Sequence, residues 1–279
     1  MTLTFAQRTA NGILEQSSIK AINFPAGEAH VAVHDDASIY DHVALLQGAD
    51  SNEIFQLSMW ANAVNSIGMN PTLLLPYLPG ARQDRGVPFG AKVYADTFNA
   101  MGFANVVCVD PHSPVMPSLL NNLTVIDSDT IIRDNVDTEG LVGVICPDQG
   151  AHARTERVAA TLGLPVYYSK KKRDFSTGKL SGFECEALPA EGRLLIVDDI
   201  CDGGGTFMGI ADATGLPKER VELWVTHGVF SGRAAQINER YNKVYTTDSH
   251  PGAFNGRVEA TVVPLLSLML ESLSEKLAV

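Results

Sequence analysis

Three aspartates and three glycines stand close together in one segment of the chain. Asp198, Asp199 and Asp202 follow an apolar run typical of a buried strand, and residues 203–205 lead through Thr206 into a segment of helical periodicity. Carboxylates this close repel one another unless a divalent cation or the hydroxyls of a sugar diol satisfy them. The spacing therefore predicts a binding site for a metal ion or a sugar.

The glycine run, Gly203, Gly204 and Gly205, supports this prediction. A glycine near a helix start costs about 0.5 to 1 kcal/mol relative to alanine, so a run of three indicates that a ligand approaches the bare backbone. A phosphate at the N-terminus of the following helix would accept backbone N–H bonds and meet the positive end of the helix dipole. The alternative is a turn between strand and helix that binds nothing. We favour one site in which the carboxylates hold a ribose and the glycine loop holds its 5-phosphate.

Short apolar runs must form the scaffold for this site. They recur along the chain, each followed by a polar or glycine-containing turn and a segment of helical periodicity, at residues 72–75, 106–109, 141–145, 194–197 and 221–225. Continuous Val, Ile and Leu are typical of parallel strands in a sheet that is buried on both faces. The predicted fold class is therefore α/β, with mostly parallel sheets flanked by helices.

Other segments predict elements at the two ends of the chain. Residues 24–28 indicate a turn, followed by an alternating strand at 29–33, and residues 52–66 indicate a helix with an apolar stripe. An amphipathic helix is expected over residues 264–277. The chain also resembles two halves built on one plan, with the boundary near residues 135–140.

The charge balance excludes one large class of partners. Lys and Arg number 21 and Asp and Glu number 32, so the formal net charge of the 279 residues is −11. An acidic protein repels a phosphate backbone unless its basic groups are segregated, and we therefore exclude a general nucleic-acid binder. The four cysteines, at positions 108, 146, 185 and 201, lie far apart and predict reduced thiols rather than disulfides or a zinc site. Without an export signal or an apolar run of about 20 residues, we expect a cytoplasmic protein that does not associate with membranes.

The segment from residue 198 to 206 resembles the motif that binds phosphoribosyl diphosphate (PRPP) in the type I phosphoribosyltransferase fold. Further segments resemble, in family order, those of the ribose-phosphate pyrophosphokinases, or PRPP synthetases. They are residues 24–28, 75–85, 109–114, 147–154, 170–173 and 226–232. Several segments in one order are more specific than any single motif. The resemblance extends from about residue 24 to the C-terminal helix.

The resemblance implies an enzyme that transfers the β,γ-diphosphoryl group of ATP to the C1 hydroxyl of a 5-phosphorylated ribose and releases AMP. It implies two phosphoribosyltransferase-like domains, with the ATP-site segments in residues 1–138 and the ribose-phosphate site in residues 139–279. We expect the last helix to pack on the first domain. Because both substrates are polyanions, Mg²⁺ is the expected cofactor. The family forms homo-oligomers, so a dimer or hexamer is expected, with the hairpin reaching a neighbour's ATP site.

The family's site residues fall on matching positions of this chain. Those implied to bind ATP are Phe24, Glu28, Arg82, Gln83, Asp84, Arg85 and His112. Those implied to bind the ribose phosphate are Asp198, Asp199, Asp202, Gly203, Gly204, Gly205 and Thr206, and the pyrophosphate loop is Asp148, Gln149, Gly150 and Arg154. The implied catalytic residues are Lys171, Arg173 and His112, and the implied metal ligands are His112 and Asp148.

Several of these residues have structural alternatives. His112 could contact phosphate, ligate Mg²⁺ through a water or cap its turn, and Asp148 could simply form a turn. Arg82 and Arg85 offer planar forks for triphosphate oxygens or adenine, at the expected carboxyl end of a strand. Residues 170–173 are expected on a mobile loop that neutralises the migrating phosphoryl group, although a solvated basic loop is the alternative. Which lysine is catalytic stays open.

The sequence departs from the family pattern at three places. Ala26 stands where the hairpin usually has an acidic residue, and the segment after Arg85 is short and lacks a usual Lys, which argues against phosphate-activated, ADP-inhibited regulation. Gly203 stands where a Thr is usual, so the phosphate pocket loses a hydroxyl donor and widens. We therefore hypothesise an acceptor with a substituted 5-phosphate, such as ADP-ribose, in nucleotide synthesis or NAD salvage. The alternatives are a phosphoribosyltransferase and a non-catalytic regulatory homologue.

Overall fold

A computed structural model describes residues 2–8, 14–33, 41–173 and 180–277 of the chain. The chain divides into two compact units, one of Met1–Ile126 with Leu266–Val279 and one of Asp127–Leu265. The second unit thus begins at Asp127 rather than at residue 139. The reason is that α3 (Ser128–Asn135) packs against α4 (His152–Leu162) of the second unit.

The first unit is built on a six-stranded sheet of order β2-β1-β5-β6-β7-β8. Its strands are β1 (Leu3–Arg8), β2 (Leu14–Gln16), β5 (Asp41–Leu46), β6 (Thr72–Leu75), β7 (Asn105–Val109) and β8 (Leu123–Ile126). β5 to β8 are parallel neighbours, and β1 pairs antiparallel with β2 and β5. The predicted strands at 72–75 and 106–109 are confirmed.

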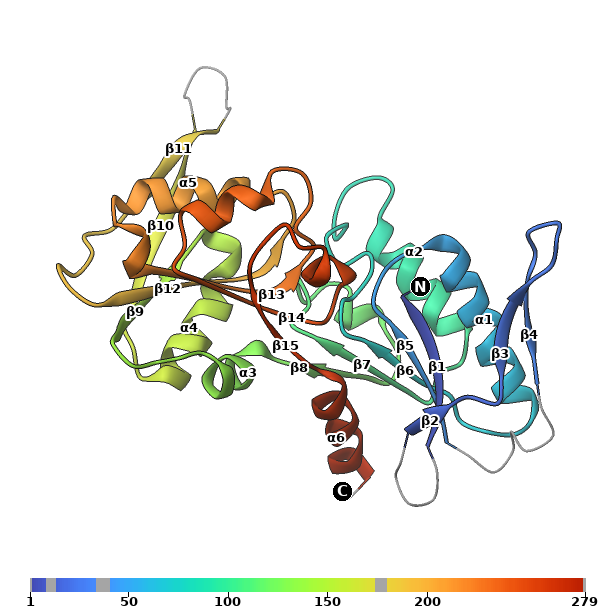
Figure 1. The fold of residues 1–279 in the computed structure, drawn as a ribbon. Helices are drawn as coiled ribbons and strands as arrows, with labels where there is room; N and C mark the ends of the chain where they lie inside the picture. The colour runs from blue at the N-terminus through green and yellow to red at the C-terminus, as the bar shows by residue number, and fades with distance from the viewer. Residues whose placement is uncertain (1, 9–13, 34–40, 174–179, 278–279) are drawn as a thin grey trace. The chain divides into compact units, whose positions relative to one another are not determined.

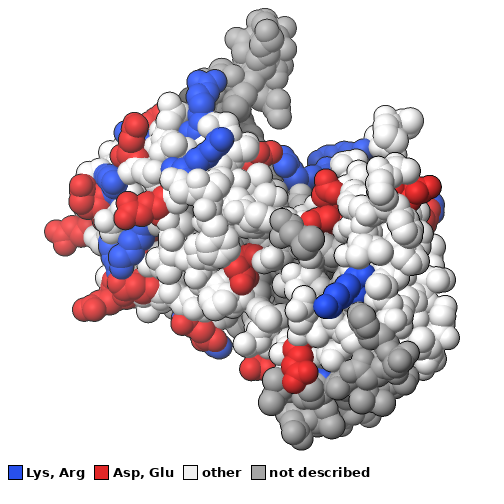
Figure 2. Space-filling view, turned by 45° about the vertical axis from the view of Figure 1, so that its right-hand side comes forward, with Lys and Arg blue, Asp and Glu red and all other residues white. Residues whose placement is uncertain are grey.

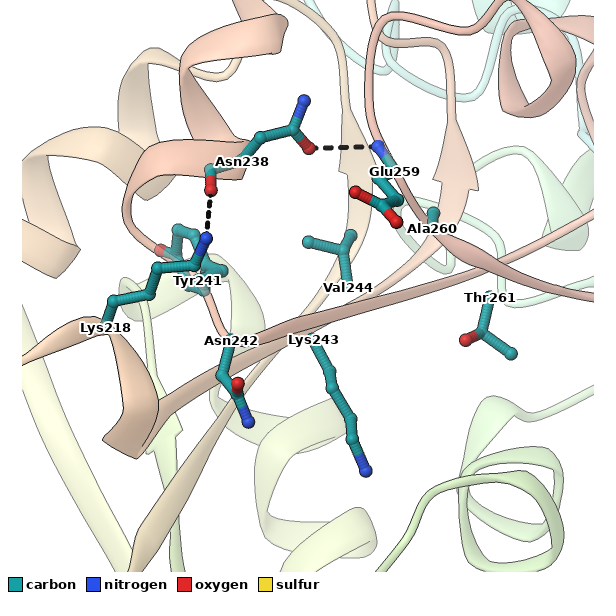
Figure 3. A pocket seen from close by; sticks show the side chains of 9 residues that line it. All are labelled: Lys218, Asn238, Tyr241, Asn242, Lys243, Val244, Glu259, Ala260 and Thr261. Atoms are coloured by element: carbon teal, nitrogen blue, oxygen red, sulfur yellow. Dashed lines mark hydrogen bonds between the residues drawn. The ribbon is translucent and has the colours of Figure 1, made fainter.

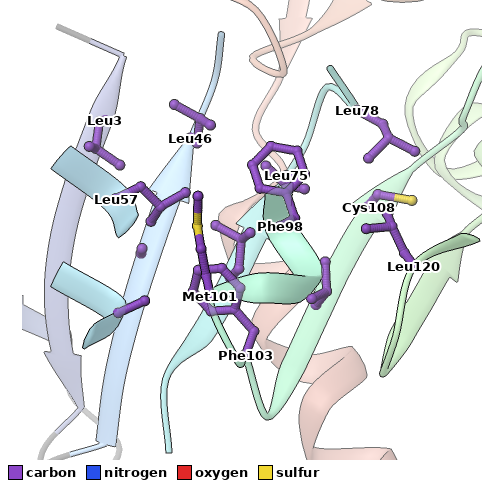
Figure 4. Close-up of a cluster of buried hydrophobic side chains, with 14 of the residues drawn as sticks. Leu3, Leu46, Leu57, Leu75, Leu78, Phe98, Met101, Phe103, Cys108 and Leu120 are labelled. Carbon is purple, nitrogen blue, oxygen red and sulfur yellow. The ribbon is translucent and has the colours of Figure 1, made fainter. Parts of the chain in front are cut away.

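The helices of this unit are α1 (Ser51–Ser66), α2 (Gly90–Ala100) and α6 (Leu266–Leu277), with a short 3₁₀ turn, η2 (Pro117–Leu119). Asp50 caps α1 by accepting hydrogen bonds from the backbone N–H groups of Asn52 and Glu53. α6 lies against β7 and β8 (Figure 1). The leucines of β6 are fully buried on both faces of the sheet. Those on one face, Leu73 and Leu75, share an apolar core with Leu57 of α1 and Phe98 of α2 (Figure 4).

A separate hairpin lies against α1. It consists of β3 (Lys20–Asn23) and β4 (Ala29–Ala32), paired antiparallel, and confirms the predicted turn at 24–28. Gly27 closes that turn with φ +95°, a conformation that side chains disfavour. Gln56 of α1 donates a hydrogen bond to Asn23 (3.1 Å), which fixes the hairpin on the helix.

The second unit is built on a seven-stranded sheet of order β11-β10-β9-β12-β13-β14-β15. Its strands are β9 (Leu141–Cys146), β10 (Val166–Arg173), β11 (Leu180–Cys185), β12 (Arg193–Cys201), β13 (Val221–Gly228), β14 (Lys243–Thr247) and β15 (Thr261–Val263). All neighbours are parallel except β10 and β11. α5 (Gly205–Thr214) covers one face, above the sheet in Figure 1, and α3 and α4 cover the other.

Two strands of this unit are longer than predicted. β12 continues past residue 197 to Cys201, and β13 continues past residue 225 to Gly228. Their polar ends remain in the ladder, because Asp198 pairs with Val225 and Ile200 with His227. The sequence suggested a turn there because polar residues replace the apolar run. Backbone pairing with a buried neighbour outweighs that signal.

Short 3₁₀ segments complete the second unit, namely η3 (Gln149–Ala151), η4 (Lys218–Arg220), η5 (Ala234–Glu239) and η6 (Pro251–Phe254). In the part of the chain that the structure describes, no helix is both long and apolar enough to cross a membrane. Figure 2 shows acidic and basic side chains interspersed on the face that it presents, with no broad basic patch among the residues drawn in colour.

Candidate active site

The loop between β12 and α5 has the geometry of an anion site. α5 begins at Gly205, directly after the turn formed by Asp202 and residues 203–204. The backbone carbonyl of Asp202 accepts a hydrogen bond from the N–H of Ser231 (2.9 Å), which fixes the turn. The first N–H groups of α5 have no intrahelical partner and lie at the carboxyl edge of the parallel sheet. A phosphate placed there would receive these donors.

The three glycines of this loop differ in what the backbone requires. Gly204 has φ +79°, and a Cβ on it would lie 3.1 Å from the Cα of Ala234 in η5. A Cβ on Gly203 or Gly205 would meet nothing within 4 Å. Only Gly204 is therefore required by the fold, and the space beside the other two is available to a ligand.

The carboxylates of Asp198 and Asp199 form a buried pair at the end of β12. The guanidinium of Arg154, on α4, lies 3.6 Å from the first and 3.5 Å from the second. Arg154 is 7% exposed and Asp199 is 4% exposed, so all three charges are largely withdrawn from water. The N–H of Asp199 also donates to the Asp198 carboxylate (2.9 Å).

Burial raises the pKa of Asp198 well above its ordinary value of 3.8, and the neighbouring charge of Asp199 raises it further. The guanidinium of Arg154 opposes this rise in pKa. One guanidinium faces two carboxylates, so an additional donor would relieve the repulsion between them. Sugar hydroxyls are donors of that kind. The structure thus gives Arg154 a definite position beside the acidic pair, while its predicted contact with pyrophosphate stays a prediction.

A second loop, residues 228–232, supports the glycine loop. The N–H groups of Val229 and Phe230 both donate to the carbonyl of Cys201 (3.0 Å each), and the Ser231 hydroxyl donates to the Asp202 carboxylate. Phe230 adopts φ +48°, an uncommon conformation for a residue with a bulky side chain. The Asp202 carboxylate is therefore held by a serine that the sequence singled out only as part of a family segment.

Sequence reasoning assigned no role to a buried polar cluster beneath this second loop. His227, 2% exposed, lies with its Nδ1 2.9 Å from the Ser249 hydroxyl, which donates to the carbonyl of Thr226 (3.1 Å). Burial and the charge of His227 lower the pKa of the neighbouring His250 below 6.5. The available signal was a threonine and a histidine directly after the apolar run at 223–225.

The loop after β9 contains the predicted pyrophosphate residues. Asp148 accepts a hydrogen bond from the N–H of Gly150 (2.9 Å) and caps η3, so the turn-forming role does occur. Gln149 lies in η3, and Arg154 follows on α4. β9 and β12 are adjacent and parallel, so this loop and the glycine loop lie at one edge of the sheet.

The basic segment 170–173 is a strand end, not a loop. The structure places it in β10, where Lys171 pairs with Phe183 and Arg173 with Leu180 of β11. The tyrosines that precede it favour an extended chain, which explains why the strand continues. The side chains of 171–173 lie outside the description, as do residues 174–179 entirely. The catalytic roles of Lys171 and Arg173 therefore stay predictions.

The predicted ATP residues of the first unit follow two neighbouring parallel strands. Arg82, Gln83, Asp84 and Arg85 come after β6, and His112 comes after β7, so both loops lie at one edge of their sheet. Gly80 opens the first loop with φ +83° and packs against Tyr94 of α2. Arg85 is highly exposed, and its Nε lies 3.4 Å from the Asp84 carboxylate. His112 is exposed as well.

The hairpin residues Phe24 and Glu28 lie on the exposed tip between β3 and β4. Phe24 is 48% exposed, and its ring stacks on His30 with the ring centroids 5.2 Å apart. The hairpin rests on α1, on a sheet separate from the strands that precede Arg82 and His112. This arrangement leaves the aromatic ring available to a ligand or a partner.

The side chains that could bind a metal suit Mg²⁺, which is held partly by water and substrate, better than a metal ion that is fully coordinated by protein ligands. Among the described residues, no group of three or more His, Cys, Asp or Glu could hold a metal ion. Mg²⁺ needs only one or two carboxylates because it keeps waters and binds substrate phosphates. Asp148, Asp198 and Asp199 supply carboxylates at one sheet edge, whereas the other predicted ligand, His112, belongs to the first unit.

A cavity of about 350 Å³ lies at the opposite edge of the second unit's sheet, where β14 and β15 begin (Figure 3). Its two lysines point in different directions: Lys218 donates to the carbonyl of Asn238 (2.6 Å), and Lys243 bonds Asp137 (2.9 Å). The cavity is thus separated from the glycine loop by the length of the strands. The ammonium groups of the two lysines therefore do not point toward one common position in the cavity.

The four cysteines are free thiols. Burial raises the pKa of Cys146 to about 11 and that of Cys201 to about 12, so neither is a thiolate near neutral pH. Cys201 is fully buried beside the glycine loop and acts there as a small packing residue. Neither of these two thiols is therefore suited to act as a nucleophile at this edge of the sheet near neutral pH.

Fold and loop together define the second unit as a phosphoribosyltransferase domain. The family model described as "Phosphoribosyl transferase domain" matches residues 121–261. A ribose-phosphate pyrophosphokinase from Corynebacterium efficiens is 32% identical over 231 residues, which cover 73% of this chain and 67% of the relative. One from Bradyrhizobium diazoefficiens is 26% identical and covers 96% of this chain and 93% of the relative.

The whole chain also has a counterpart among solved structures. The phosphoribosylpyrophosphate synthetase of Mycobacterium smegmatis matches with a TM-score of 0.77 and 21% identity, over 95% of this chain and 91% of that chain. This likeness confirms the α/β fold with two phosphoribosyltransferase-like units. The chain belongs to the ribose-phosphate pyrophosphokinase family and is a diphosphotransferase enzyme.

Proposed function

We propose that the enzyme transfers the β,γ-diphosphoryl group of ATP to the anomeric hydroxyl of a ribose that carries a 5-phosphate. The observation that supports this most directly is the edge formed by β9, β12 and α5. There a buried carboxylate pair adjoins an open helix N-terminus, as a ribose and its phosphate require. The relatives named ribose-phosphate pyrophosphokinase support the same activity.

In the proposed reaction the C1 oxygen forms a bond to the β-phosphorus while the bond from that phosphorus to the α-phosphate oxygen breaks. The hydroxyl proton is released and AMP leaves. Asp198 and Asp199 would accept hydrogen bonds from the 2- and 3-hydroxyls, and residues 202–206 would donate to the 5-phosphate. Lys171 and Arg173 would neutralise the migrating group. Bound Mg²⁺, held by carboxylates such as Asp148 and by substrate phosphates, would offset the negative charge of both substrates.

We further propose that the acceptor carries a substituent on its 5-phosphate, as ADP-ribose does, and that the product serves nucleotide or NAD salvage. A threonine hydroxyl usual in the family is missing at Gly203, and that residue is exposed with nothing within 4 Å of a Cβ. A phosphodiester has one less ionisable oxygen than a phosphomonoester and needs more room. Both differences favour glycine here.

Mass spectrometry would test these proposals directly. The protein is incubated with Mg-ATP and either ribose 5-phosphate or ADP-ribose, and AMP and a product heavier by one diphosphate are sought. We expect both with ADP-ribose. The variant Gly203→Thr should shift the ratio of kcat/KM values toward ribose 5-phosphate by about tenfold, because it restores a donor and narrows the pocket. An unchanged ratio, or fast use of ribose 5-phosphate with no discrimination in favour of ADP-ribose, would refute the larger acceptor.

Two other activities remain as competitors. The first is base transfer from PRPP, which would use the domain matched at residues 121–261 and leave the first unit without a catalytic use. Release of diphosphate from PRPP and a nucleobase, without AMP formation from ATP, would establish that activity. No AMP with any acceptor would indicate a non-catalytic homologue.

We also propose a homo-oligomer in which the exposed tip with Phe24 and Glu28 reaches a neighbour's ATP site. A measurement of the mass in solution tests whether the chain forms such an oligomer.

A further inference from the structure

The strand order of the second sheet predicts on which side of the glycine loop a substituent on the acceptor's 5-phosphate would lie. β9, β12, β13 and β14 are neighbours in that order and are all parallel, so the loops at their carboxyl ends form a row. In the proposed function the loop after β9 serves the diphosphate at C1, and the loop after β12 holds the 5-phosphate. A substituent on that phosphate must therefore leave toward the loops after β13 and β14.

Those two loops are joined to the glycine loop by hydrogen bonds. Cys201, before the glycines, accepts from Phe230 N (3.0 Å), and the Phe230 carbonyl accepts from the Asn255 side chain (3.1 Å). Gly252, in the loop after β14, packs so closely that a Cβ on it would lie 2.1 Å from the Val229 carbonyl. The three loops thus form one braced layer. Neighbouring strands are about 4.8 Å apart, so the loop after β14 lies about 10 Å from the phosphate site.

The side chain of Phe254 is exposed to solvent on this layer. It is 67% exposed, more than Phe24 or Phe55, although Gly252 and Ala253 of the same turn are buried. The turn is fixed on both sides, because His250 accepts from Gly252 N (2.9 Å) and Asn255 bonds the neighbouring loop. An exposed ring on a rigid turn is a ready stacking surface, since little conformational entropy is lost when a ligand covers it.

Two arginines belong to the loops that follow the glycine loop in the row. Arg233 follows the loop after β13 and is exposed, and Arg257, also exposed, donates to the carbonyl of Gly232 (3.4 Å). Arg233 adjoins Gly232 in the chain, and the Arg257 guanidinium contacts that same residue, so both arginines belong to the braced loops that also carry Phe254. In a chain of net charge −11, positive groups at this position suit the second phosphate of a diphosphate bridge.

We propose that Arg233, Arg257 and Phe254 form a subsite for the 5-substituent of the acceptor, with the guanidinium groups on its outer phosphate and the ring stacked on its base. This inference rests on the proposed function. It makes Phe254 a specificity-determining residue: the ring distinguishes an acceptor that carries a planar base from ribose 5-phosphate, which ends at the glycine loop.

Equilibrium binding separates this inference from the proposed activity. ADP-ribose and ribose 5-phosphate are titrated calorimetrically, without ATP, into the full chain and into Phe254→Ala and Phe254→Trp. Loss of base stacking should weaken ADP-ribose binding about tenfold in Phe254→Ala and leave ribose 5-phosphate binding unchanged. Phe254→Trp should retain the affinity for ADP-ribose. Phe55→Ala, which removes an exposed ring from α1, is the matched control and should bind both acceptors normally.

Several outcomes would overturn the inference. Equal weakening for both acceptors, or no weakening, would leave diphosphate transfer intact and remove the stacking role. A wild-type chain that binds ribose 5-phosphate but not ADP-ribose would overturn both the subsite and the larger acceptor. A change of mass in solution for Phe254→Ala, with normal ADP-ribose affinity, would assign the ring to a subunit contact instead. Absence of AMP formation despite ring-dependent ADP-ribose binding would refute the proposed activity alone.

Discussion

At the scale of single residues, the acidic pair is the costliest feature of the site. The carboxylates of Asp198 and Asp199 lie in a largely buried position, and both face the guanidinium of Arg154. Because these two carboxylates share one guanidinium, neutralising one of them leaves a balanced ion pair and no uncompensated charge. In the proposed function, sugar hydroxyls would donate to this pair and offset the repulsion between its two charges.

The first prediction concerns the stability of Asp198→Asn. The pKa of Asp198 is raised in the folded chain, so the folded state keeps a proton that the unfolded state has released. Wild-type stability therefore falls as pH rises above the ordinary value of 3.8 and through the raised pKa. Asparagine avoids this loss, and the variant should gain about 1 kcal/mol in free energy of unfolding at pH 8.

Urea denaturation at several pH values would measure this effect. The gain should shrink as pH is lowered and vanish where the wild-type carboxyl is protonated in both states. A gain that is independent of pH would contradict the assignment of the strain to the charge of Asp198. The same variant should lose most diphosphate transfer, because one hydroxyl-binding carboxylate is removed.

At the scale of elements, the carboxyl end of β12 positions the chemistry. The strand extends to Cys201, the turn reverses through Gly204, and α5 starts with its free N–H groups at the sheet edge. Loop 228–232 secures the turn through Ser231. The glycine loop is thus a braced structural unit rather than a flexible segment of small residues.

The second prediction compares Gly204→Ala with Gly205→Ala. At Gly204 alanine must adopt a left-handed conformation, which costs about 1 to 2 kcal/mol, and its Cβ would press on Ala234. At Gly205 a Cβ meets nothing within 4 Å, and alanine favours the first turn of α5. Thermal unfolding should show a lower melting temperature for Gly204→Ala and an equal or higher one for Gly205→Ala. Equal losses in both variants would contradict the geometry of the turn.

At the scale of the whole molecule, two α/β units each place residues that we propose to bind ligands at the carboxyl edge of a parallel sheet. The first unit presents Arg82, Arg85 and His112, and the second presents the acidic pair and the glycine loop. The chain has a net charge of −11, and its proposed substrates are polyanions. Binding must therefore depend on a few well-placed cations and on added metal.

The third prediction concerns removal of metal. Because no described group of three His, Cys, Asp or Glu could hold a metal, Mg²⁺ should act with the substrates rather than stabilise the fold. A chelator should abolish AMP formation and leave the melting temperature of the substrate-free protein unchanged, and added Mg²⁺ should restore turnover. A lower melting temperature in chelator would indicate a structural metal instead.

Much of the fold could be predicted because a buried strand has a recognisable apolar pattern in the local sequence. The apolar runs at 72–75, 106–109 and 141–145 became strands within a residue of their predicted bounds, since a sheet covered on both faces requires continuous apolar residues. The start of the second unit and the strand at 170–173 were not predicted as observed. The first depends on packing of α3 against α4, and the second depends on pairing of β10 with β11, the next strand along the chain.

The sequence alone determined the types of groups in the candidate site: paired aspartates, a glycine run and a helix start, in one local segment and in family order. Only the tertiary structure decided how they are held. It placed Arg154 of α4 beside the acidic pair and Ser231 on Asp202, and it showed that Gly204 alone is required by the backbone. Strand order placed Phe254 in the loop after β14, two strands away from the glycine loop that follows β12. These relations join segments far apart along the chain, and such contacts are fixed by packing rather than by local pattern.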